Sequence, residues 1–492
     1  MQDLKHKVLR GGVARLCAQG ANFLLRLGSL MILARLLAPR DFGLVGMVTA
    51  FTGVLGMFRD FGLSSAAVQR GTITEEQMSM LFWINIAAGG SLGLLTVAMA
   101  PAIAAFYHEP RLFGVTVVLG AAFILNSVGV QHGAILQRQL RFTAIAVIGT
   151  IAWLVGTVIA IAGAKAGYGY WALVAMAVAT PFTSTVSVWL ATRWVPGRPR
   201  RRVGIRSMMR FGGTVTLQGL LVYAATNVEK VLLGRFWGAV AIGIYGRAYQ
   251  LISVPTDNVN GPAGEVAFAG LSRIQDDPGR LKSYFLKGYS LLLGLSLPIT
   301  IACVLFADDI ILVFLGPKWK AAAAILRLLA PTILVFTIAN PIGWLLTSIG
   351  KVERLLKMNL VITPIMIVGY VLGLPYGPKG VAFAYSTLLT LWLVTLVIWA
   401  LHDSVVLPRD IVLTLSRPLA SAVVATALAF AVQFACRQLA SPFPRLVLES
   451  TVLLVTFSVM LLFVTGQKSL YLDVLRSLKG PSTVEKKILS SA

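Results

Sequence analysis

Charged residues, histidines and cysteines are all scarce in this chain of 492 residues. Asp, Glu, Lys and Arg together make up 13% of the sequence, whereas hydrophobic residues make up 57%. No polar segment is long enough for a separate soluble domain between apolar runs of about twenty residues. Only helices and closed barrels satisfy their backbone hydrogen bonds in lipid, and runs of this length are typical of helices. We therefore predict an all-α integral membrane protein.

The residues that usually build catalytic or metal sites are equally few. The three cysteines, Cys17, Cys303 and Cys436, lie far apart in apolar runs, so we interpret them as buried small residues. The four histidines show no spacing typical of a metal site or of acyl transfer. No G-x-x-x-x-G-K-[S/T] phosphate loop occurs, which argues against ATP hydrolysis by this chain. We predict a protein that is not an enzyme and has no cofactor.

Apolar runs bounded by charges, glycine and proline divide the chain into fourteen expected spans. With a cytoplasmic N-terminus, 27 of the 43 Lys and Arg fall in inside segments and eight in outside segments, which predicts both termini inside. Two tryptophans, Trp153 and Trp392, fall in mid-span and are assigned to packing. The expected spans are 12–36, 42–66, 78–103, 112–135, 142–164, 168–192, 208–235, 239–266, 284–306, 321–348, 354–373, 379–402, 415–436 and 445–466.

Acidic residues are outnumbered, with 19 Asp and Glu against 43 Lys and Arg, for a formal charge of +24. The densest basic stretch, 193–206, lies between the sixth and seventh spans. Such a stretch could bind nucleic acid, but a cytoplasmic linker held against anionic lipid headgroups explains it better. We therefore expect membrane lipids and no nucleic acid among its partners.

The two halves of the chain resemble each other. The pattern Ile32-Leu-Ala-Arg35 with Gly43-Leu-Val-Gly46 returns 200 residues later as Leu232-Leu-Gly-Arg235 with Gly243-Ile-Tyr-Gly246. Six spans precede the repeat, so the halves have the same orientation, which predicts two parallel six-helix bundles related by a pseudo-twofold axis. The expected divisions are an N-terminal bundle over 1–192, a basic linker over 193–207, a C-terminal bundle over 208–402, and two further spans with a cytoplasmic tail over 403–492.

A polar stripe interrupts the first span. Arg15, Gln19, Asn22 and Arg26 are spaced by four, three and four residues, which places them on one face of a helix. The second span adds Arg59 and Asp60 near its end. Facing lipid, three arginines at membrane depth would cost about 8 kcal/mol or more. The stripe must therefore face water or an anion.

The second half carries a looser version of this stripe. Tyr223, Asn227 and Lys230 share a face of the seventh span, and the eighth span offers Arg247, Tyr249 and Glu265 around two prolines expected to kink or break it, Pro255 and Pro262. The acids within the spans, Asp60, Glu229 and Glu265, could bind a proton or Na⁺ as a coupling ion. Local ion pairs explain two of them equally well: Asp60 with Arg59, and Glu229 with Lys230.

Four segments carry a resemblance to a known family: Leu33-Ala-Arg-Leu-Leu-Ala-Pro-Arg-Asp-Phe-Gly43, Arg59-Asp-Phe-Gly-Leu-Ser-Ser-Ala-Ala-Val-Gln69, Gly243-Ile-Tyr-Gly-Arg-Ala-Tyr-Gln250 and Leu271-Ser-Arg-Ile-Gln-Asp-Asp277. The chain resembles the bacterial polysaccharide transporters, that is, Wzx-type flippases such as colanic acid and succinoglycan exporters. Their superfamily includes multidrug exporters and the lipid II flippase.

The resemblance implies a V-shaped inner-membrane transporter that moves an undecaprenyl-pyrophosphate-linked oligosaccharide, for exopolysaccharide or lipopolysaccharide synthesis, by alternating access. A polysaccharide polymerase and a chain-length regulator are implied as partners. Related flippases place cavity arginines on the first, second and eighth spans, which implies that role for Arg26, Arg59 and Arg247. Arg15 is a further candidate from the polar stripe, and Gln19, Asn22, Asn227, Lys230 and Tyr249 are candidate polar wall residues. The planar guanidinium group suits the oxygens of a pyrophosphate.

Two other functions remain open. An ion-coupled exporter of small organic cations could use the same fold, although an arginine-rich cavity would repel such cargo. A membrane-embedded glycan polymerase, ligase or acyltransferase would need a substantial external loop or an acid/base constellation. The longest expected external connection, 307–320, is short and contains no histidine.

Overall fold

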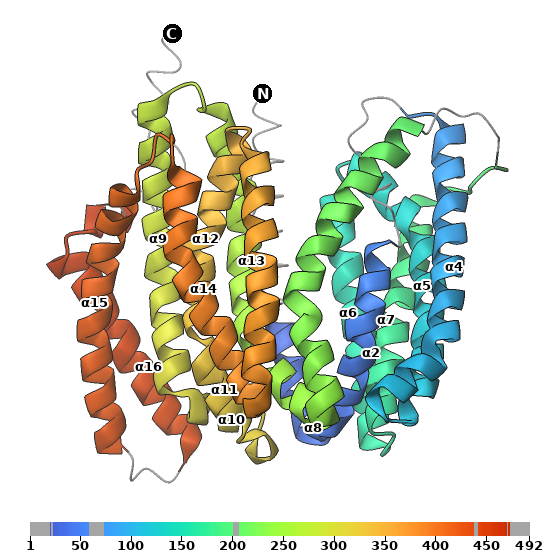
Figure 1. Cartoon of the computed structure of the whole chain (residues 1–492), viewed down its shortest axis with the longest axis horizontal. Helices are drawn as coiled ribbons and strands as arrows, with labels where there is room; N and C mark the ends of the chain where they lie inside the picture. Colours follow the sequence, from blue (N-terminus) through green and yellow to red (C-terminus); the bar gives the residue numbers. More distant parts are fainter. Residues whose placement is uncertain are drawn as a thin grey trace. The chain divides into compact units, whose positions relative to one another are not determined.

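The computed structural model describes residues 20, 23–58, 73–199, 206–436, 441–469 and 471–472. The described residues form helices and no strand (Figure 1). The first helix covers residues 23–36. The others are α2 (Pro39–Met57), α4 (Glu75–Tyr107), α5 (Arg111–Arg138), α6 (Phe142–Lys165), α7 (Tyr170–Thr192), α8 (Arg206–Arg273), α9 (Pro278–Leu305), α10 (Ala307–Phe314), η1 (Pro317–Trp319), α11 (Ala322–Leu329), α12 (Pro331–Ser348), α13 (Val352–Gly373), η2 (Leu374–Tyr376), α14 (Gly377–Leu401), α15 (Pro408–Ala435), α16 (Pro442–Val459) and a π-helical turn (Met460–Val464).

Where the structure describes them, these helices follow the spans expected from the sequence, with ends that differ by up to about seven residues; most of the expected start of the first span and the expected end of the second lie outside the described residues. Nine helical stretches in the described part are long and apolar enough to cross a membrane, and one of them, Val352–Leu401, contains both α13 and α14. The long helix α8 covers the seventh and eighth expected spans. The prediction of an all-α integral membrane protein with multiple spans is confirmed.

The break within α8 lies at a glycine and not at a proline. Gly238 has φ +78° and ψ −177°, a backbone conformation that favours glycine, and it separates two helical segments. The helix assignment continues through Pro255 and Pro262, so these prolines do not break the helix, and the alternative of a kink at these positions stays a prediction. A proline removes one hydrogen bond from a helix, and neighbouring helices within a membrane protein can compensate for that loss.

Local sequence explains where several helices begin. Both α2 and α15 start with Pro-Arg-Asp, and the aspartate accepts a hydrogen bond from the backbone N–H of the residue before the proline. The Asp41 carboxylate accepts from Ala38 N–H at 2.9 Å, and the Asp410 carboxylate accepts from Leu407 N–H at 2.8 Å. Proline has the φ of a first helical turn, and a carboxylate there is favoured by the helix dipole.

The chain divides into two compact units. Unit 1 comprises 1–254, 314–322 and 359–385, and unit 2 comprises 255–313, 323–358 and 386–492. The boundaries between the units fall inside three helices, so α8, α13 and α14 each contribute residues to both units. The division into two six-helix bundles, with its V shape, stays a prediction.

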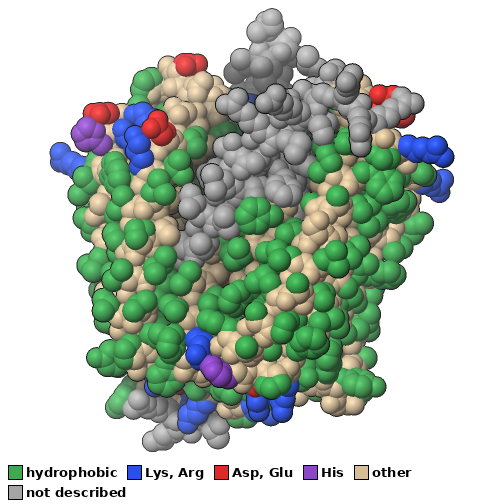
Figure 2. All heavy atoms as spheres, turned by 45° about the vertical axis from the view of Figure 1, so that its right-hand side comes forward, with side chains coloured by type: hydrophobic (Ala, Val, Ile, Leu, Met, Phe, Trp, Pro, Cys, Tyr) green, Lys and Arg blue, Asp and Glu red, His purple; other side chains and the backbone are tan. Residues whose placement is uncertain are grey.

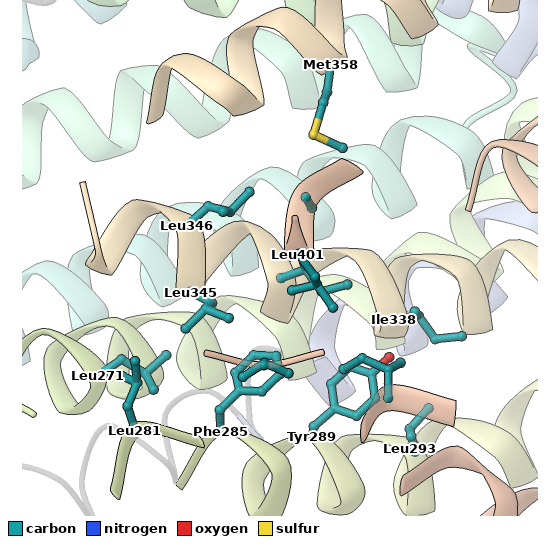
Figure 3. Packing of buried hydrophobic residues seen from close by; sticks show 14 residues of the cluster. Leu271, Leu281, Phe285, Tyr289, Leu293, Ile338, Leu345, Leu346, Met358 and Leu401 are labelled. Carbon is teal, nitrogen blue, oxygen red and sulfur yellow. The ribbon is translucent and has the colours of Figure 1, made fainter. Parts of the chain in front are cut away.

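The main core of unit 2 joins the ends of several helices (Figure 3). Phe285 and Tyr289 of α9 stack with ring centroids 5.6 Å apart and pack with leucines of α12. A second cluster joins α9, α15 and α16 around Phe306, Ala425 and Phe457. The two C-terminal helices are therefore packed onto unit 2 through α9.

The outer surfaces of the helices are apolar. On the face drawn in Figure 2, hydrophobic side chains cover the sides, and Lys, Arg, Asp and Glu gather near the two ends. Large side chains such as Leu94, Leu190 and Leu372 are at least 70% exposed. A soluble protein rarely exposes apolar patches of this extent, whereas a bilayer-spanning protein presents them to lipid.

The first residues of the predicted basic linker are held against unit 1. The Trp83 indole N–H donates to the Gly197 carbonyl at 2.8 Å, and Gly197 N–H donates to the Ser79 hydroxyl at 2.9 Å. The buried His132 ring stacks on Trp189 and lies 3.2 Å from the Trp194 carbonyl. Residues 193–199 are therefore part of the folded unit, and residues 200–205 of this stretch lie outside the described residues.

Candidate functional site

A cavity of about 590 Å³ lies within unit 1. Its wall is formed by the first helix together with α2, α5, α6, α7 and α8. Asn126, Trp153 and Thr180 come from near the middle of α5, α6 and α7, so the cavity reaches membrane depth. The polar side chains of the wall are Ser29, Thr49, Asn126, Thr180, Ser184, Arg247 and Gln250. A polar hollow at this depth is expected where a membrane protein handles a hydrophilic group.

Arg247 is the charged residue that the structure places on this wall. Its guanidinium carbon lies 4.3 Å from the centre of the Phe42 ring, and the group donates a hydrogen bond to the Gln250 amide oxygen. Its Nε has no hydrogen-bond partner among the described residues. The arginine is thus held by an aromatic face and by Gln250, while its Nε is buried without a partner in the described part of the chain. Its role in substrate binding, predicted from the sequence, stays a prediction.

Arg26 lies next to the same cavity. It is exposed, and its guanidinium carbon is 5.5 Å from the centre of the Trp153 ring, which is part of the wall. The indole N–H of Trp153 has no hydrogen-bond partner in the described part of the chain. The sequence assigned Trp153 to packing, and in the structure the partly buried ring also forms part of the cavity wall.

Several predicted site residues cannot be placed. Arg15, Gln19, Asn22, Arg59 and Asp60 lie outside the described residues. The side chain of Glu265 also lies outside them, although α8 continues through its backbone. Their proposed roles stay predictions.

The polar residues of the seventh span form a second cluster in unit 1. Lys230 Nζ donates to the Asn227 amide oxygen at 2.6 Å and lies 5.6 Å from the centre of the Tyr249 ring. No salt bridge joins Lys230 to Glu229 among the described residues, so the suggested direct ion pair does not form, although the Lys230 charge still acts on the Glu229 carboxyl. Adjacent residues on a helix point about 100° apart, which explains why the two side chains separate.

Glu229 is buried in the neighbourhood of several tyrosines. It is 2% exposed, and its Oε2 has no hydrogen-bond partner within the described residues. The carboxyl group interacts electrostatically with the hydroxyls of Tyr245, Tyr370 and Tyr385, which come from α8, α13 and α14. The Tyr370 and Tyr385 rings stack with centroids 6.0 Å apart. A buried carboxyl among hydroxyls can exchange a proton or contribute oxygens to a small cation.

One end of unit 1 is closed where α2 crosses α8. A Cβ on Gly43 would overlap the backbone carbonyl of Ala239, and a Cβ on Gly243 would overlap the backbone carbonyl of Pro39. The two contacts are reciprocal under the 200-residue repeat, since position 43 meets 239 and position 243 meets 39. Only glycine allows this approach, so the helices touch through their backbones beside the cavity residues Phe42 and Val45.

A tryptophan after α10 strengthens this closure. The Trp319 indole N–H donates to the Ala34 carbonyl at 2.8 Å, and its ring lies edge-on to Phe42 with centroids 5.4 Å apart. Trp319 is fully buried. The end of the cavity at Pro39 is therefore sealed by helix contact and by an aromatic side chain.

The small polar residues of the cavity wall and two of the tyrosines were not predicted from the sequence. Asn126, Thr180 and Ser184 are uncharged side chains within apolar runs, where charge is the stronger signal. A search for polar residues in mid-span would have found them. Tyr370 and Tyr385 follow Glu229 by 141 and 156 residues, and the sequence alone gave no signal that their hydroxyls interact electrostatically with it.

Comparisons with known proteins agree with this fold and family. The family described as "Polysaccharide biosynthesis protein" matches residues 32–324. The lipopolysaccharide biosynthesis protein WzxC of Escherichia coli (strain K12) is 26% identical over 379 residues, covering 75% of this chain and 76% of WzxC. The teichuronic acid biosynthesis protein TuaB of Bacillus subtilis (strain 168) is 29% identical over 299 residues, covering 60% of this chain and 61% of TuaB.

Among solved structures, the lipid II flippase MurJ in an inward closed conformation has the same fold. It superposes with a TM-score of 0.73 at 13% sequence identity, and the match covers 92% of this chain and 98% of MurJ. At this identity the likeness concerns the fold alone. Since the family match covers more than half of the residues and the described helices form the same fold as a known flippase, this chain belongs to the polysaccharide biosynthesis protein family of Wzx-type membrane proteins.

Proposed function

We propose that this protein is a flippase that moves an undecaprenyl-pyrophosphate-linked oligosaccharide across the bacterial inner membrane. The observation that carries the proposal is the cavity of unit 1, which combines Arg247 with hydroxyl and amide side chains at membrane depth. The names of WzxC and TuaB, which refer to the synthesis of surface polysaccharides, support the same class of substrate.

The wall residues suit the two parts of such a headgroup. Arg247 brings a guanidinium group to the cavity wall, and Arg26 lies over the ring of Trp153, which also lines the cavity. Charge-assisted hydrogen bonds from arginine to phosphate are among the stronger polar contacts in proteins. We propose that Arg59 and Arg15 add to this positive charge.

The uncharged part of the wall suits a sugar. Trp153 offers an aromatic face, and Asn126, Thr180 and Ser184 offer groups that can hydrogen-bond to sugar hydroxyls. The Thr180 hydroxyl, like the Trp153 indole, has no hydrogen-bond partner among the described residues. Both atoms are buried in this structure, and the Thr180 hydroxyl lies against Gly156 of α6, so these two side chains would have to turn to reach a sugar. The first sugars of the oligosaccharide would therefore lie beside α6 and α7.

Translocation would proceed by alternating access. The distribution of Lys and Arg predicts that the Pro39 end of α2 faces away from the cytoplasm. The crossing of α2 and α8 at Gly43 and Gly243 would then close the external side. Release of the headgroup requires this crossing to separate, while the apolar lipid chain stays in the bilayer.

We propose that Glu229 couples this movement to a proton or Na⁺. Its unpartnered oxygen and the surrounding tyrosine hydroxyls support an ion site in unit 1. We further propose an orientation with both termini in the cytoplasm, and a polysaccharide polymerase and a chain-length regulator as partners. In this role the protein transports its substrate without changing it chemically.

Replacement of Arg247 tests the proposal directly. Loss of one charge-assisted hydrogen bond weakens binding by about 1.5 to 3 kcal/mol, which is roughly 10- to 150-fold. Arg247→Ala should therefore stop polysaccharide export in cells, whereas Arg247→Lys keeps the charge and should retain part of it. The measurement is the surface polysaccharide of a deletion strain that carries each variant at equal membrane level.

Arg273→Ala is the matched control, since Arg273 is an exposed arginine at the end of the same helix. Export should continue at its normal level in this variant. Full export by Arg247→Ala would refute the cavity as the pyrophosphate site. Efflux of cationic dyes by the wild type, in place of polysaccharide export, would favour the small-molecule exporter.

A further inference from the structure

A second polar pocket lies in unit 2, away from the proposed transport cavity. Its volume is about 590 Å³, and its wall comes from α9, from α15 and from residues 466–469 that follow the π-helical turn. Five of the residues that line it are serines or threonines. Nothing in the proposed transport cycle uses this pocket.

The pocket has an excess of positive charge. Lys287 of α9 and Arg417 of α15 line it, and neither has an ion-pair partner among the described residues. The carboxylate that also lines it, Asp410, is neutralised by Lys282 Nζ at 2.6 Å and accepts the Leu407 N–H. Two uncompensated cations therefore face one hollow. Both residues are exposed, so water solvates them in the pocket, and an anion that entered the hollow would meet both positive charges.

The floor of the pocket is polar and ordered. Ser290 and Gln467 are 4% and 6% exposed, and the Ser290 hydroxyl donates to the Gln467 amide oxygen at 3.2 Å. Gln467 is held in turn by its backbone N–H, which donates to the Leu461 carbonyl at 3.2 Å. A buried serine and glutamine beneath two cations form a prepared site for oxygen atoms, since hydroxyl and amide groups hydrogen-bond to anionic oxygens.

The position of the pocket suits the headgroup of a lipid. It lies where α9 and α15 begin, at the end of unit 2 that the sequence predicts to be cytoplasmic. Directly beside it, α15 exposes the apolar side chains of Val412, Leu413 and Leu419, which are 63%, 56% and 42% exposed. Acyl chains could follow this apolar surface while the headgroup enters the polar pocket. Basic pockets between membrane helices on the cytoplasmic side are known binding places for anionic headgroups.

We propose that this pocket binds the phosphate of an anionic membrane lipid, with Lys287 and Arg417 as its cationic contacts. The planar guanidinium of Arg417 can take two phosphate oxygens, and the ammonium of Lys287 can take a third. The same chemistry would accept a phospholipid of the cytoplasmic leaflet or a polyprenyl phosphate carrier.

Native mass spectrometry of the purified full-length chain can measure this binding. The protein is titrated separately with phosphatidylglycerol, with undecaprenyl phosphate and with inorganic phosphate. We expect saturable binding of at least one of the two lipids. The double variant Lys287→Gln/Arg417→Gln should bind that lipid about 30-fold more weakly, from the loss of two cations near an anionic headgroup.

Two further variants separate the pocket from general surface charge. Arg280→Gln/Lys357→Gln also removes two cations from this end of unit 2, at side chains that are 81% and 62% exposed and outside the pocket. Its lipid affinity should change less than about twofold. Ser283→Trp keeps both cations but places a large ring at the pocket wall, and it should weaken binding as strongly as the double variant.

The lipid that shows the tighter saturable binding identifies the source of the phosphate. Equal loss in the pocket double variant and in the surface double variant would overturn the proposal, and so would normal binding by Ser283→Trp. Inorganic phosphate that binds as tightly as either lipid would overturn the assignment to a lipid. Size-exclusion chromatography checks that each variant elutes at the same volume as the wild type and is therefore folded. None of the changed residues lines the transport cavity.

Discussion

The crossing of α2 and α8 makes a specific prediction about the external closure of the transporter. A Cβ at position 243 would overlap the Pro39 carbonyl oxygen, which belongs to the backbone and cannot rotate away. Gly243→Ala must therefore push the helices apart in the closed state. Overpacking of this kind costs about 1 to 3 kcal/mol. In the open state the same methyl group would meet no such obstacle.

The equilibrium should shift toward the open state by this amount. Since 1.4 kcal/mol corresponds to a factor of ten, 1 to 3 kcal/mol predicts roughly a 5- to 150-fold larger open population. A cysteine at Val45, which lines the cavity, can report this population in a variant without the natural cysteines. Intact cells are treated with a thiol reagent that does not cross the membrane, and the rate of labelling is measured.

Gly246→Ala is the matched control on the same helix. A Cβ at Gly246 has no heavy atom within 4 Å, so this variant gains the same helix propensity without the overlap. Labelling of the cysteine at position 45 should be unchanged in Gly246→Ala and faster in Gly243→Ala. Equal labelling rates in the two variants, at equal membrane levels, would refute the closure of the external side by this crossing.

Three further predictions concern single side chains. Trp153→Ala should reduce export about tenfold or more through loss of the aromatic face, and Trp153→Phe should keep most of it, as measured by surface polysaccharide. Glu229→Gln should make transport of lipid-linked oligosaccharide in proteoliposomes insensitive to an imposed proton or Na⁺ gradient, and a wild-type response would exclude Glu229 as the coupling residue. Arg445→Ala should lower the free energy of unfolding in detergent by about 3 to 5 kcal/mol, as measured by thermal denaturation. The substitution leaves Asp309, which is 3% exposed, without its ion-pair partner. Arg327→Ala removes an ion pair with an exposed partner and should cost about 1 kcal/mol or less, so equal losses for Arg327 and Arg445 would contradict this reasoning.

The sequence predicted the helices well because the bilayer imposes a strong constraint on them. Apolar runs of sufficient length must become helices, and their ends are marked by residues such as Pro39 and Pro408 at the helix start. The break in α8 was harder to predict, because proline is the usual signal for a break. Gly238 has a positive φ at the break between the two helical segments of α8. In the sequence it is one glycine among 46, with no signal that sets it apart.

The candidate site was predicted less completely. Charge in an apolar run pointed to Arg247, which lines the cavity, and to Arg26, which lies over the ring of the wall residue Trp153. The pairing of Glu229 with Lys230 failed, because neighbours in sequence point in different directions on a helix. The tyrosines around Glu229 and the role of Trp153 depend on packing between helices far apart in the sequence. Such contacts cannot be derived from periodicity alone.

The reciprocal glycine contact also bears on the origin of this protein. When position 43 of one copy meets position 239 of the other, and 243 meets 39, each copy uses the same patch to contact its counterpart. This is the geometry of an isologous interface between identical subunits. A half-length ancestor could therefore have met a second copy of itself through one self-complementary surface before the two genes became joined. After fusion, the remaining surfaces of each half could diverge in sequence. Gly43 and Gly243 would have been kept, because both still make the close backbone contact of the original symmetric interface.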